Sequence, residues 1–273
     1  MNTEQRQQLP IGIFDSGVGG LTVLKAIREE LPRERLVYLG DTARLPYGTK
    51  SPASISRYAC QAAAKLQEQG IKLLVVACNT ASAVALDALR VQLQPLPVIG
   101  VVEPGAAAAV AARPAGAHLV LATEATVGLG AYRRALQSLD AAASVSELAC
   151  EMLVALAEEG WTDGEIAATI VQRYLTQIPD PAFRPDSVIL GCTHFPLLRE
   201  PIARAFAADV SIVDSASTTA SHARDVLTKM DLLGDSEPSL RLLATDGAAR
   251  FARVGGRFLE QDLTAADIEI VDL

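Results

Sequence analysis

Residues 75–82 read Val75-Val76-Ala77-Cys78-Asn79-Thr80-Ala81-Ser82, an apolar strand that runs into a cysteine and then into a helical pattern. Residues 188–196 repeat this arrangement as Val188-Ile189-Leu190-Gly191-Cys192-Thr193-His194-Phe195-Pro196. Short apolar runs alternate with amphipathic stretches along the rest of the chain, an order typical of βαβ units with a mostly parallel sheet. The sequence therefore predicts an α/β fold with one cysteine motif in each half.

The predicted elements follow from β-branched apolar runs and from apolar residues spaced three and four apart. Strands are expected at residues 11–14, 36–39, 73–77, 98–101, 119–122, 187–190, 211–213, 240–244 and 268–271. Helices are expected at residues 21–31, 53–68, 81–93, 105–112, 127–139, 147–158, 163–175, 197–207 and 217–229. Ligands gather at the carboxyl ends of such strands. The residues that fall there are Asp15, Asp41, Cys78, Glu103, Thr123, Cys192 and Asp214.

Proline and glycine punctuate the chain at two places where a domain boundary is expected. Pro95–Pro97 and Glu103-Pro104-Gly105 follow the first cysteine motif, and a proline-rich loop at 178–185 precedes the second. A chain of 273 residues is long enough for two compact domains. We expect the chain to pass from the first domain to the second near residue 101 and to return to the first domain near residue 212. The first domain then contains 1–100 and 212–273, and the second contains 101–211.

Composition narrows the class of protein. Half of the residues are hydrophobic, but no stretch is long enough for a membrane span, and the polar start of the chain predicts no secretory signal. We therefore expect a cytoplasmic protein with no membrane partner. A net charge of −8 argues against nucleic acid as the primary partner. The four cysteines lack CxxC spacing and are expected to stay reduced in that compartment.

Two glycine-containing loops resemble ligand-binding turns. The segment from Gly12 to Thr22 leads from a strand through Gly17, Gly19 and Gly20 into a helix, where backbone N–H groups favour an anion such as a carboxylate. A dinucleotide site is the rival interpretation, but Thr22 stands where the third glycine should be. The loop at 38–48, with its proline, glycine and tyrosine, can close over a pocket and present backbone N–H groups to an anionic end of a ligand.

The paired cysteines are the strongest chemical signal. A thiol at a strand end and helix start feels the positive end of the helix dipole, which we expect to lower its pKa toward neutrality. Zinc is disfavoured by the spacing, a disulfide by the compartment, and single-thiol covalent catalysis by the unexplained second cysteine. Two thiols on opposite faces of a carbon can remove a proton and return one. Cys60 and Cys150 lie in helical patterns and are expected to be core residues.

Six motifs in order over nearly the whole chain resemble those of the glutamate racemase family. They are Phe14-Asp15-Ser16-Gly17-Val18-Gly19-Gly20, Gly40-Asp41-Thr42-Ala43 with Pro46-Tyr47-Gly48, Ala77-Cys78-Asn79-Thr80-Ala81, Gly100-Val101-Val102-Glu103-Pro104, Ala122-Thr123 with Ala125-Thr126, and Gly191-Cys192-Thr193-His194-Phe195-Pro196-Leu197. The resemblance implies two similar α/β domains with the active site in the cleft between them and a C-terminal segment that returns to the first. It also implies an isomerase that needs neither cofactor nor metal, with glutamate as its small-molecule substrate, and that supplies D-glutamate for peptidoglycan and so for cell shape. We also expect a homodimer.

Residue by residue, the resemblance implies that Cys78 acts on D-glutamate and Cys192 on L-glutamate, with Asp15 and His194 as assisting groups. The substrate-binding positions that it implies are Asp15, Ser16, Pro46, Tyr47, Gly48, Asn79, Thr80, Thr126, Thr193 and His194, with Thr123 a weaker candidate. Glu158 would support Cys192, although Glu159 competes for this role.

The chain departs from the family pattern at Glu151 and Ala155, where prolines are usual, and at Leu129, where many members carry a serine. Two alternatives stay open. One is a related cofactor-free racemase, isomerase or decarboxylase that acts on aspartate or another α-acidic substrate. The other is a non-catalytic amino-acid-binding protein on the same scaffold.

Overall fold

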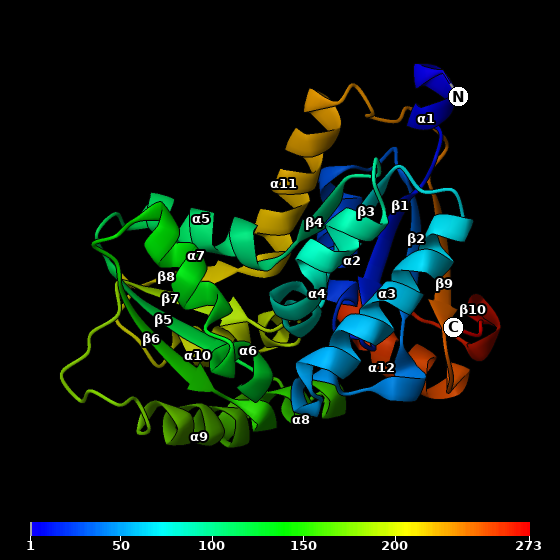
Figure 1. Ribbon diagram of the computed structural model, residues 1–273. Helices are drawn as coiled ribbons and strands as arrows, with labels where there is room; N and C mark the ends of the chain where they lie inside the picture. The colour runs from blue at the N-terminus through cyan, green and yellow to red at the C-terminus, as the bar shows by residue number, and fades with distance from the viewer. Residues whose placement is uncertain (1) are drawn as a thin grey trace.

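Two parallel β-sheets lie side by side in the computed structural model, which describes residues 2–273 (Figure 1). Sheet A has six strands in the order β10-β9-β2-β1-β3-β4. Their bounds are β1 Ile11–Asp15, β2 Arg35–Gly40, β3 Leu73–Val76, β4 Val98–Gly100, β9 Ser239–Ala244 and β10 Ile268–Ile270. The strands β1 and β3 are buried along their whole length, because helices cover both faces of the sheet.

Sheet B is smaller and has four strands in the order β6-β5-β7-β8, again all parallel. Their bounds are β5 Ala117–Ala122, β6 Ser144–Ala149, β7 Ser187–Gly191 and β8 Ser211–Asp214. The predicted α/β class with two mostly parallel sheets is confirmed. The return point at 212 lies inside β8, which pairs with β7 through Asp214. By strand pairing, sheet B therefore extends past that point.

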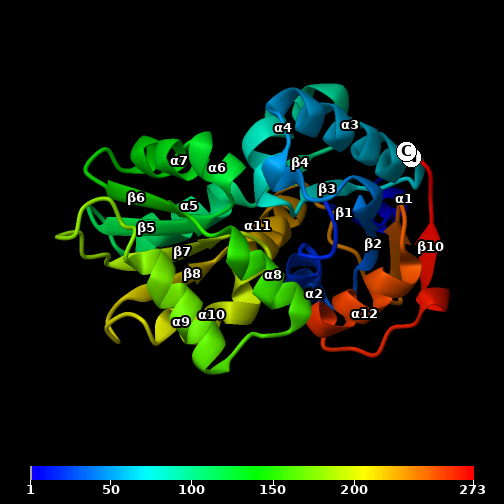
Figure 2. The same ribbon diagram turned by 90° about the horizontal axis from the view of Figure 1, so that it is seen from below.

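The helices occupy both faces of each sheet (Figures 1 and 2). Their bounds are α1 Thr3–Gln7, α2 Leu21–Glu30, α3 Pro52–Glu68, α4 Asn79–Gln92, α5 Val102–Ala112, α6 Glu124–Gly128, α7 Ala131–Leu139, α8 Glu151–Glu159, α9 Gly164–Leu175, α10 Arg199–Ala203, α11 Ser215–Lys229 and α12 Ala248–Leu259. Short 3₁₀ turns are η1 Thr42–Arg44, η2 Tyr47–Thr49, η3 Phe195–Leu198 and η4 Ala265–Asp267. Figures 1 and 2 show α11 at the junction of the two halves, where it packs on α2 and α5.

The hydrophobic core is continuous across the junction. One cluster of buried residues contains Ile11 and Leu21 from the sheet A half together with Leu119 and Leu190 from the sheet B half. Burial of apolar side chains is the main favourable term in folding. The shared cluster therefore holds the two halves in a defined arrangement.

Several predicted elements differ in the structure. The helix expected from residue 147 begins at Glu151, because residues 144–149 form β6, an edge strand whose serines and Glu147 interrupt the apolar pattern. The helix expected at 127–139 is broken into α6 and α7 at Gly130, which has a φ of 57°. The helices α1 and α12 were not predicted.

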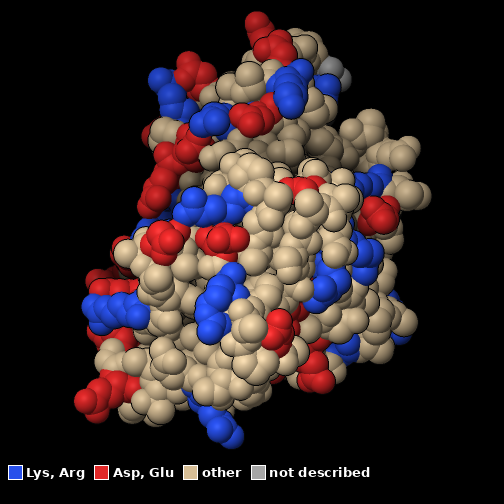
Figure 3. Space-filling view, turned by 90° about the vertical axis from the view of Figure 1, so that its left-hand side faces the viewer, with Lys and Arg blue, Asp and Glu red and all other residues tan. Residues whose placement is uncertain are grey.

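The length of the helices and the distribution of surface charge concern possible membrane and macromolecular partners. Within the part of the chain that the structure describes, no helix is long and apolar enough to cross a membrane. Figure 3 shows basic and acidic side chains interspersed over the face that it displays.

Candidate active site

Asp15 is the last residue of β1, and the turn that follows it packs against the second cysteine motif. Asp15 is buried, and its Oδ2 accepts a hydrogen bond of 2.9 Å from the N–H of Gly17. Burial raises the pKa of this carboxyl, against the charge of His194 and the backbone N–H groups. A Cβ at Gly19 would lie 2.4 Å from Thr193 Oγ1 and 2.5 Å from the His194 ring. Only glycine allows this close approach of the two turns.

Cys78 lies at the N-cap of α4 and is buried. Its Sγ accepts a hydrogen bond from the N–H of Ala81 at 3.4 Å and donates to Ser16 Oγ at 3.5 Å. Burial and then the charge of Asp15 raise the pKa of Cys78 to about 12. The expectation that the helix start would lower this pKa is wrong, because desolvation and a neighbouring carboxylate outweigh the N–H contact.

Cys192 lies directly after β7, and its environment is different. Its Sγ is 3.7 Å from Nδ1 of His194, and Nε2 of His194 is 3.2 Å from Glu158 Oε1. Burial opposes the charged imidazole, but the hydrogen bonds to Cys192 and Glu158 outweigh it and raise the pKa of His194 to about 10. The hydrogen bond to His194 in turn lowers the pKa of Glu158. Glu158 and Glu159 were the two candidates for the residue that supports Cys192. Glu158 contacts His194, whereas the side chain of Glu159 is exposed.

The two cysteines are electrostatically coupled. Burial and the charge of Asp15 are the main causes of the raised pKa of Cys78, and a charge on Cys192 adds to them. Both thiols are buried, each with 6% of its surface exposed. Within residues 2–273, every cysteine is free and no group of three or more His, Cys, Asp or Glu side chains could hold a metal ion.

Threonine hydroxyls join the first cysteine motif to sheet B. Thr80 Oγ1 is 3.0 Å from Thr123 Oγ1 and 3.3 Å from Thr126 Oγ1, and the last two are 3.0 Å apart. Asn79 donates from Nδ2 to the hydroxyl of Tyr132 at 2.8 Å, while its Oδ1 is buried without a partner. These contacts fix the start of α4 between the halves.

The loop of Pro46, Tyr47 and Gly48 lies over Thr123. A Cβ at Gly48 would be 3.2 Å from the Cβ of Thr123. The hydroxyl of Tyr47 is already engaged, because it donates to Oδ2 of the buried Asp41 at 2.5 Å. Any contact of Tyr47 with a substrate would therefore come from its backbone.

Three acids expected at strand ends are engaged elsewhere. Asp41 accepts from Tyr47, Arg44 and Thr245. Glu103 pairs with Arg90 at 2.8 Å. Asp214 caps α11 and pairs with Arg199 at 3.1 Å.

Comparison with known proteins decides the family. A family model described as Asp/Glu/Hydantoin racemase matches residues 11–223. The chain belongs to this racemase family. It is therefore an amino-acid racemase, which is an isomerase.

Individual relatives of the racemase confirm the resemblance of its motifs to those of glutamate racemase. The glutamate racemase of Geobacter metallireducens is 47% identical over 251 residues, which cover 91% of this chain and 92% of the relative. The crystal structure of glutamate racemase from Francisella tularensis in complex with D-glutamate superposes with a TM-score of 0.89 at 35% identity, covering 97% and 98% of the two chains. Glutamate racemase RacE1 from Bacillus anthracis gives a TM-score of 0.91 at 36% identity, covering 98% of each chain.

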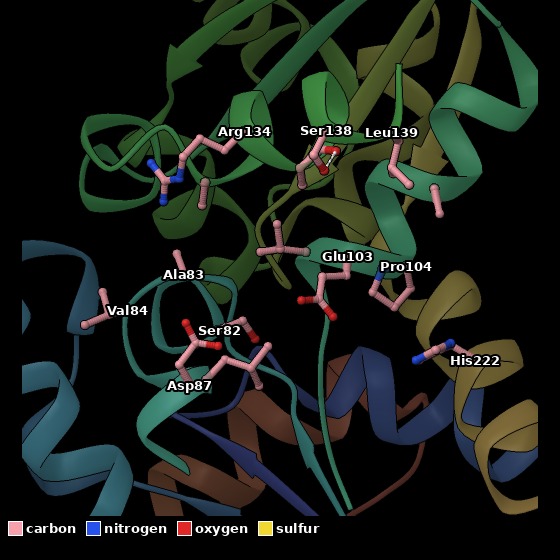
Figure 4. A pocket seen from close by; sticks show the side chains of 15 residues that line it. Ser82, Ala83, Val84, Asp87, Glu103, Pro104, Arg134, Ser138, Leu139 and His222 are labelled. Carbon is pink, nitrogen blue, oxygen red and sulfur yellow. Dashed lines mark hydrogen bonds between the residues drawn. The ribbon is translucent and has the colours of Figure 1, made fainter. Parts of the chain in front are cut away.

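One large cavity of the racemase is not lined by either thiol. It has a volume of about 630 Å³ and lies between α4, α5, α7 and α11 (Figure 4). Its lining includes Ser82 and Asp87 from α4 and Glu103 from α5, which was expected at a strand end, but none of the residues predicted to act in catalysis or to bind substrate. The cysteines lie at the carboxyl ends of β3 and β7, and Cys78 is one turn of α4 away from Ser82.

Sequence reasoning missed one residue beside the site of the racemase. Arg250 donates from Nη2 to Glu158 Oε2 at 2.7 Å. It lies on α12, a helix that was not predicted although its apolar residues Phe251, Val254 and Phe258 recur at helical spacing. That periodicity could have located the helix, but no sequence signal could have paired Arg250 with a residue far away in the chain.

Proposed function

We propose that this racemase interconverts L- and D-glutamate by moving the α-proton between Cys78 and Cys192, without a cofactor. The observation that carries the proposal is that the two buried thiols have neighbours of different charge, a carboxylate for one and an imidazole for the other. The charge of Asp15 acts on Cys78, and Cys192 contacts the imidazole of His194 at 3.7 Å. Burial and the charge of Asp15 favour the protonated form of Cys78, whereas Cys192 has an imidazole as its hydrogen-bonding partner.

The proposed reaction requires one thiolate and one thiol on opposite faces of the α-carbon. Because the pKa of His194 is raised to about 10, the imidazole is protonated at neutral pH and stabilises a thiolate on Cys192. Burial and Asp15 keep Cys78 protonated in the resting enzyme. That state is ready for L-glutamate, from which Cys192 takes the proton while Cys78 delivers another. The reverse reaction exchanges the two roles.

The residues proposed to hold the substrate surround both thiols. Ser16 contacts Cys78, and Thr193 lies against the turn at Gly19. The hydroxyls of Thr80 and Thr126 lie within hydrogen-bond distance of each other. Asp15 can receive the substrate ammonium, and hydroxyl and N–H donors can bind the carboxylates. The unpartnered Oδ1 of Asn79 is a further acceptor in this region.

The relatives support glutamate over aspartate. Relatives named glutamate racemase reach 47% identity, whereas an aspartate racemase from Picrophilus torridus is only 17% identical and shares the fold alone. We therefore propose that the enzyme supplies D-glutamate for peptidoglycan synthesis.

The test is purified protein incubated with L-glutamate in the presence of a chelator and without added cofactor. Circular dichroism should decay to zero as the enantiomers reach an equal mixture. L-aspartate in a parallel reaction should keep its signal. Activity that requires pyridoxal phosphate or a metal, or that prefers aspartate, would reject the proposal.

A further inference from the structure

The helix α12 from the sheet A half meets the carboxylate that contacts His194 in the sheet B half. Arg250 and Arg257 lie two turns apart on α12, and both reach the last turn of α8. Arg250 donates to Glu158 Oε2 at 2.7 Å, and Arg257 donates to the main-chain oxygen of Glu158 at 2.6 Å. Figure 2 shows α8 beside α12 and α2 at the junction of the halves.

The two oxygens of Glu158 have different partners. Oε2 accepts from Arg250, while Oε1 contacts Nε2 of His194, whose Nδ1 contacts Cys192. The contacts therefore form a continuous path from a guanidinium through a carboxylate and an imidazole to a thiol. A carboxylate held at one oxygen can present the other in a fixed direction.

Burial indicates what the contact between Arg250 and Glu158 does. The side chain of Glu158 is 19% exposed and that of His194 is 13% exposed, but Arg250 is 54% exposed. An ion pair with such an exposed partner contributes little to stability. The contact of Glu158 with His194 is better shielded from water, because both of these side chains are less than 20% exposed.

The charged and titratable groups around His194 come from several elements. Glu158 on α8 and Cys192 after β7 contact the ring, and Asp15 after β1 acts on it through its charge. Cys150 lies near Cys192, and Phe258 of α12 packs edge-on against the ring at 5.3 Å. Of these groups, only Glu158 is held by a cation from the other half of the molecule.

We propose that Arg250 is a positioning residue that holds Glu158 against His194 and thereby stabilises the negative charge of Cys192. The proposal rests on the proposed two-thiol function and deepens it. It makes the state of the thiol in the sheet B half depend on a helix of the sheet A half.

The test compares Arg250→Ala and Arg250→Lys with Arg253→Ala. Arg253 is exposed on the same helix, and in the described residues it forms no hydrogen bond or ion pair. The rate at which iodoacetamide alkylates each cysteine is measured at a series of pH values by mass spectrometry of the cysteine-containing peptides. Each rate is divided by its value at the alkaline plateau, which removes differences in the accessibility of the thiols. Because both enantiomers have the same free energy, kcat/KM must change equally in both directions. Alkylation can therefore assign the effect to one thiol.

In Arg250→Ala, we expect Cys192 alkylation at neutral pH to fall by about three- to tenfold, the effect of one lost hydrogen bond. Cys78 should react as in the wild type. The alkaline limb of kcat should move to lower pH, because His194 loses its proton more easily. Cys192 alkylation in Arg250→Lys should lie between that in Arg250→Ala and that in the wild type. Arg253→Ala should match the wild type.

An unchanged Cys192 profile in Arg250→Ala would overturn the proposal, even if the melting temperature fell, because Arg250 would then only join two helices. Equal loss at Cys78 and Cys192 would also overturn it, since it indicates general loosening. If Arg250→Ala does not fold, Arg250→Lys against Arg253→Lys decides by the same readout. Wild-type protein without racemase activity would reject the proposed function but would leave the alkylation comparison valid.

Discussion

Cys78 and Cys192 are both buried, yet their immediate neighbours differ in charge. Asp15 acts on Cys78, and His194 contacts Cys192. At the scale of single residues, the proposed mechanism uses this difference to give the two thiols different roles before substrate binds. It also makes the two thiols distinguishable by experiment.

The first prediction concerns the thiols themselves. Cys78→Ala and Cys192→Ala should each lose racemisation by roughly 10²–10⁴-fold, because one proton transfer is removed. In deuterated water, Cys192→Ala should label D-glutamate in preference and Cys78→Ala should label L-glutamate, measured by chiral mass spectrometry. Alanine at Cys60, which is half-buried on α3, is the control and should retain activity. Substantial racemisation in either site variant would contradict the two-thiol mechanism.

The second prediction concerns Thr193, which is buried between the two turns. Thr193→Val keeps the shape but removes a donor proposed to bind a substrate carboxylate. We expect kcat/KM to fall by about ten- to a hundredfold, the cost of a hydrogen bond to a charged group. Thr219→Val is a matched control, because its hydroxyl is also buried but bonds within α11. Equal kinetics in the Thr193 variant and the wild type would place the substrate elsewhere.

At the scale of elements, the turn between β1 and α2 contacts the turn after β7. A methyl group at Gly19 would collide with Thr193 and His194, neither of which can move freely. Gly19→Ala should therefore lower the free energy of unfolding by about 1–3 kcal/mol and displace His194, with a large loss of kcat.

Gly128→Ala is the control for this third prediction, because a Cβ there meets nothing within 4 Å. Urea unfolding and racemisation measured on both variants test the contact. A Gly19→Ala enzyme as active as Gly128→Ala would show that the two turns do not have to touch.

At the scale of the whole molecule, the buried His118 and the partly buried His194 make stability depend on pH in opposite directions. Burial lowers the pKa of His118 below its ordinary value of 6.5, so protonation favours the unfolded chain and stability falls as pH drops below about 6.5. The pKa of His194 is raised to about 10, so its contribution is full below 6.5 and is lost as pH rises toward 10.

The fourth prediction follows from these signs. In His118→Gln, the melting temperature should fall less steeply as the pH drops below about 6.5. In His194→Gln, the melting temperature should fall less steeply as the pH rises from 6.5 to about 10. Differential scanning fluorimetry across pH measures both. Each variant serves as the control for the other, and the same change in both pH ranges would contradict the assignment.

The fold was largely predictable because local residue types encode it. Buried strands such as β1, β3 and β7 are short apolar runs, and burial on both faces selects such runs wherever they lie. The placement of Cys78 and Cys192 at strand ends followed directly. In contrast, β6 was missed because an edge strand needs no continuous apolar pattern.

The sequence alone therefore determined the α/β class, the strand ends that carry the thiols, and the motifs that indicate the racemase family. Only the tertiary structure showed that Glu158 contacts His194, that Arg250 holds Glu158, and that the hydroxyl of Tyr47 faces Asp41. It also reversed the expected direction of the Cys78 pKa. The physical reason is that strand burial depends on residues close together in the chain, whereas charge and hydrogen bonding depend on neighbours brought together by folding.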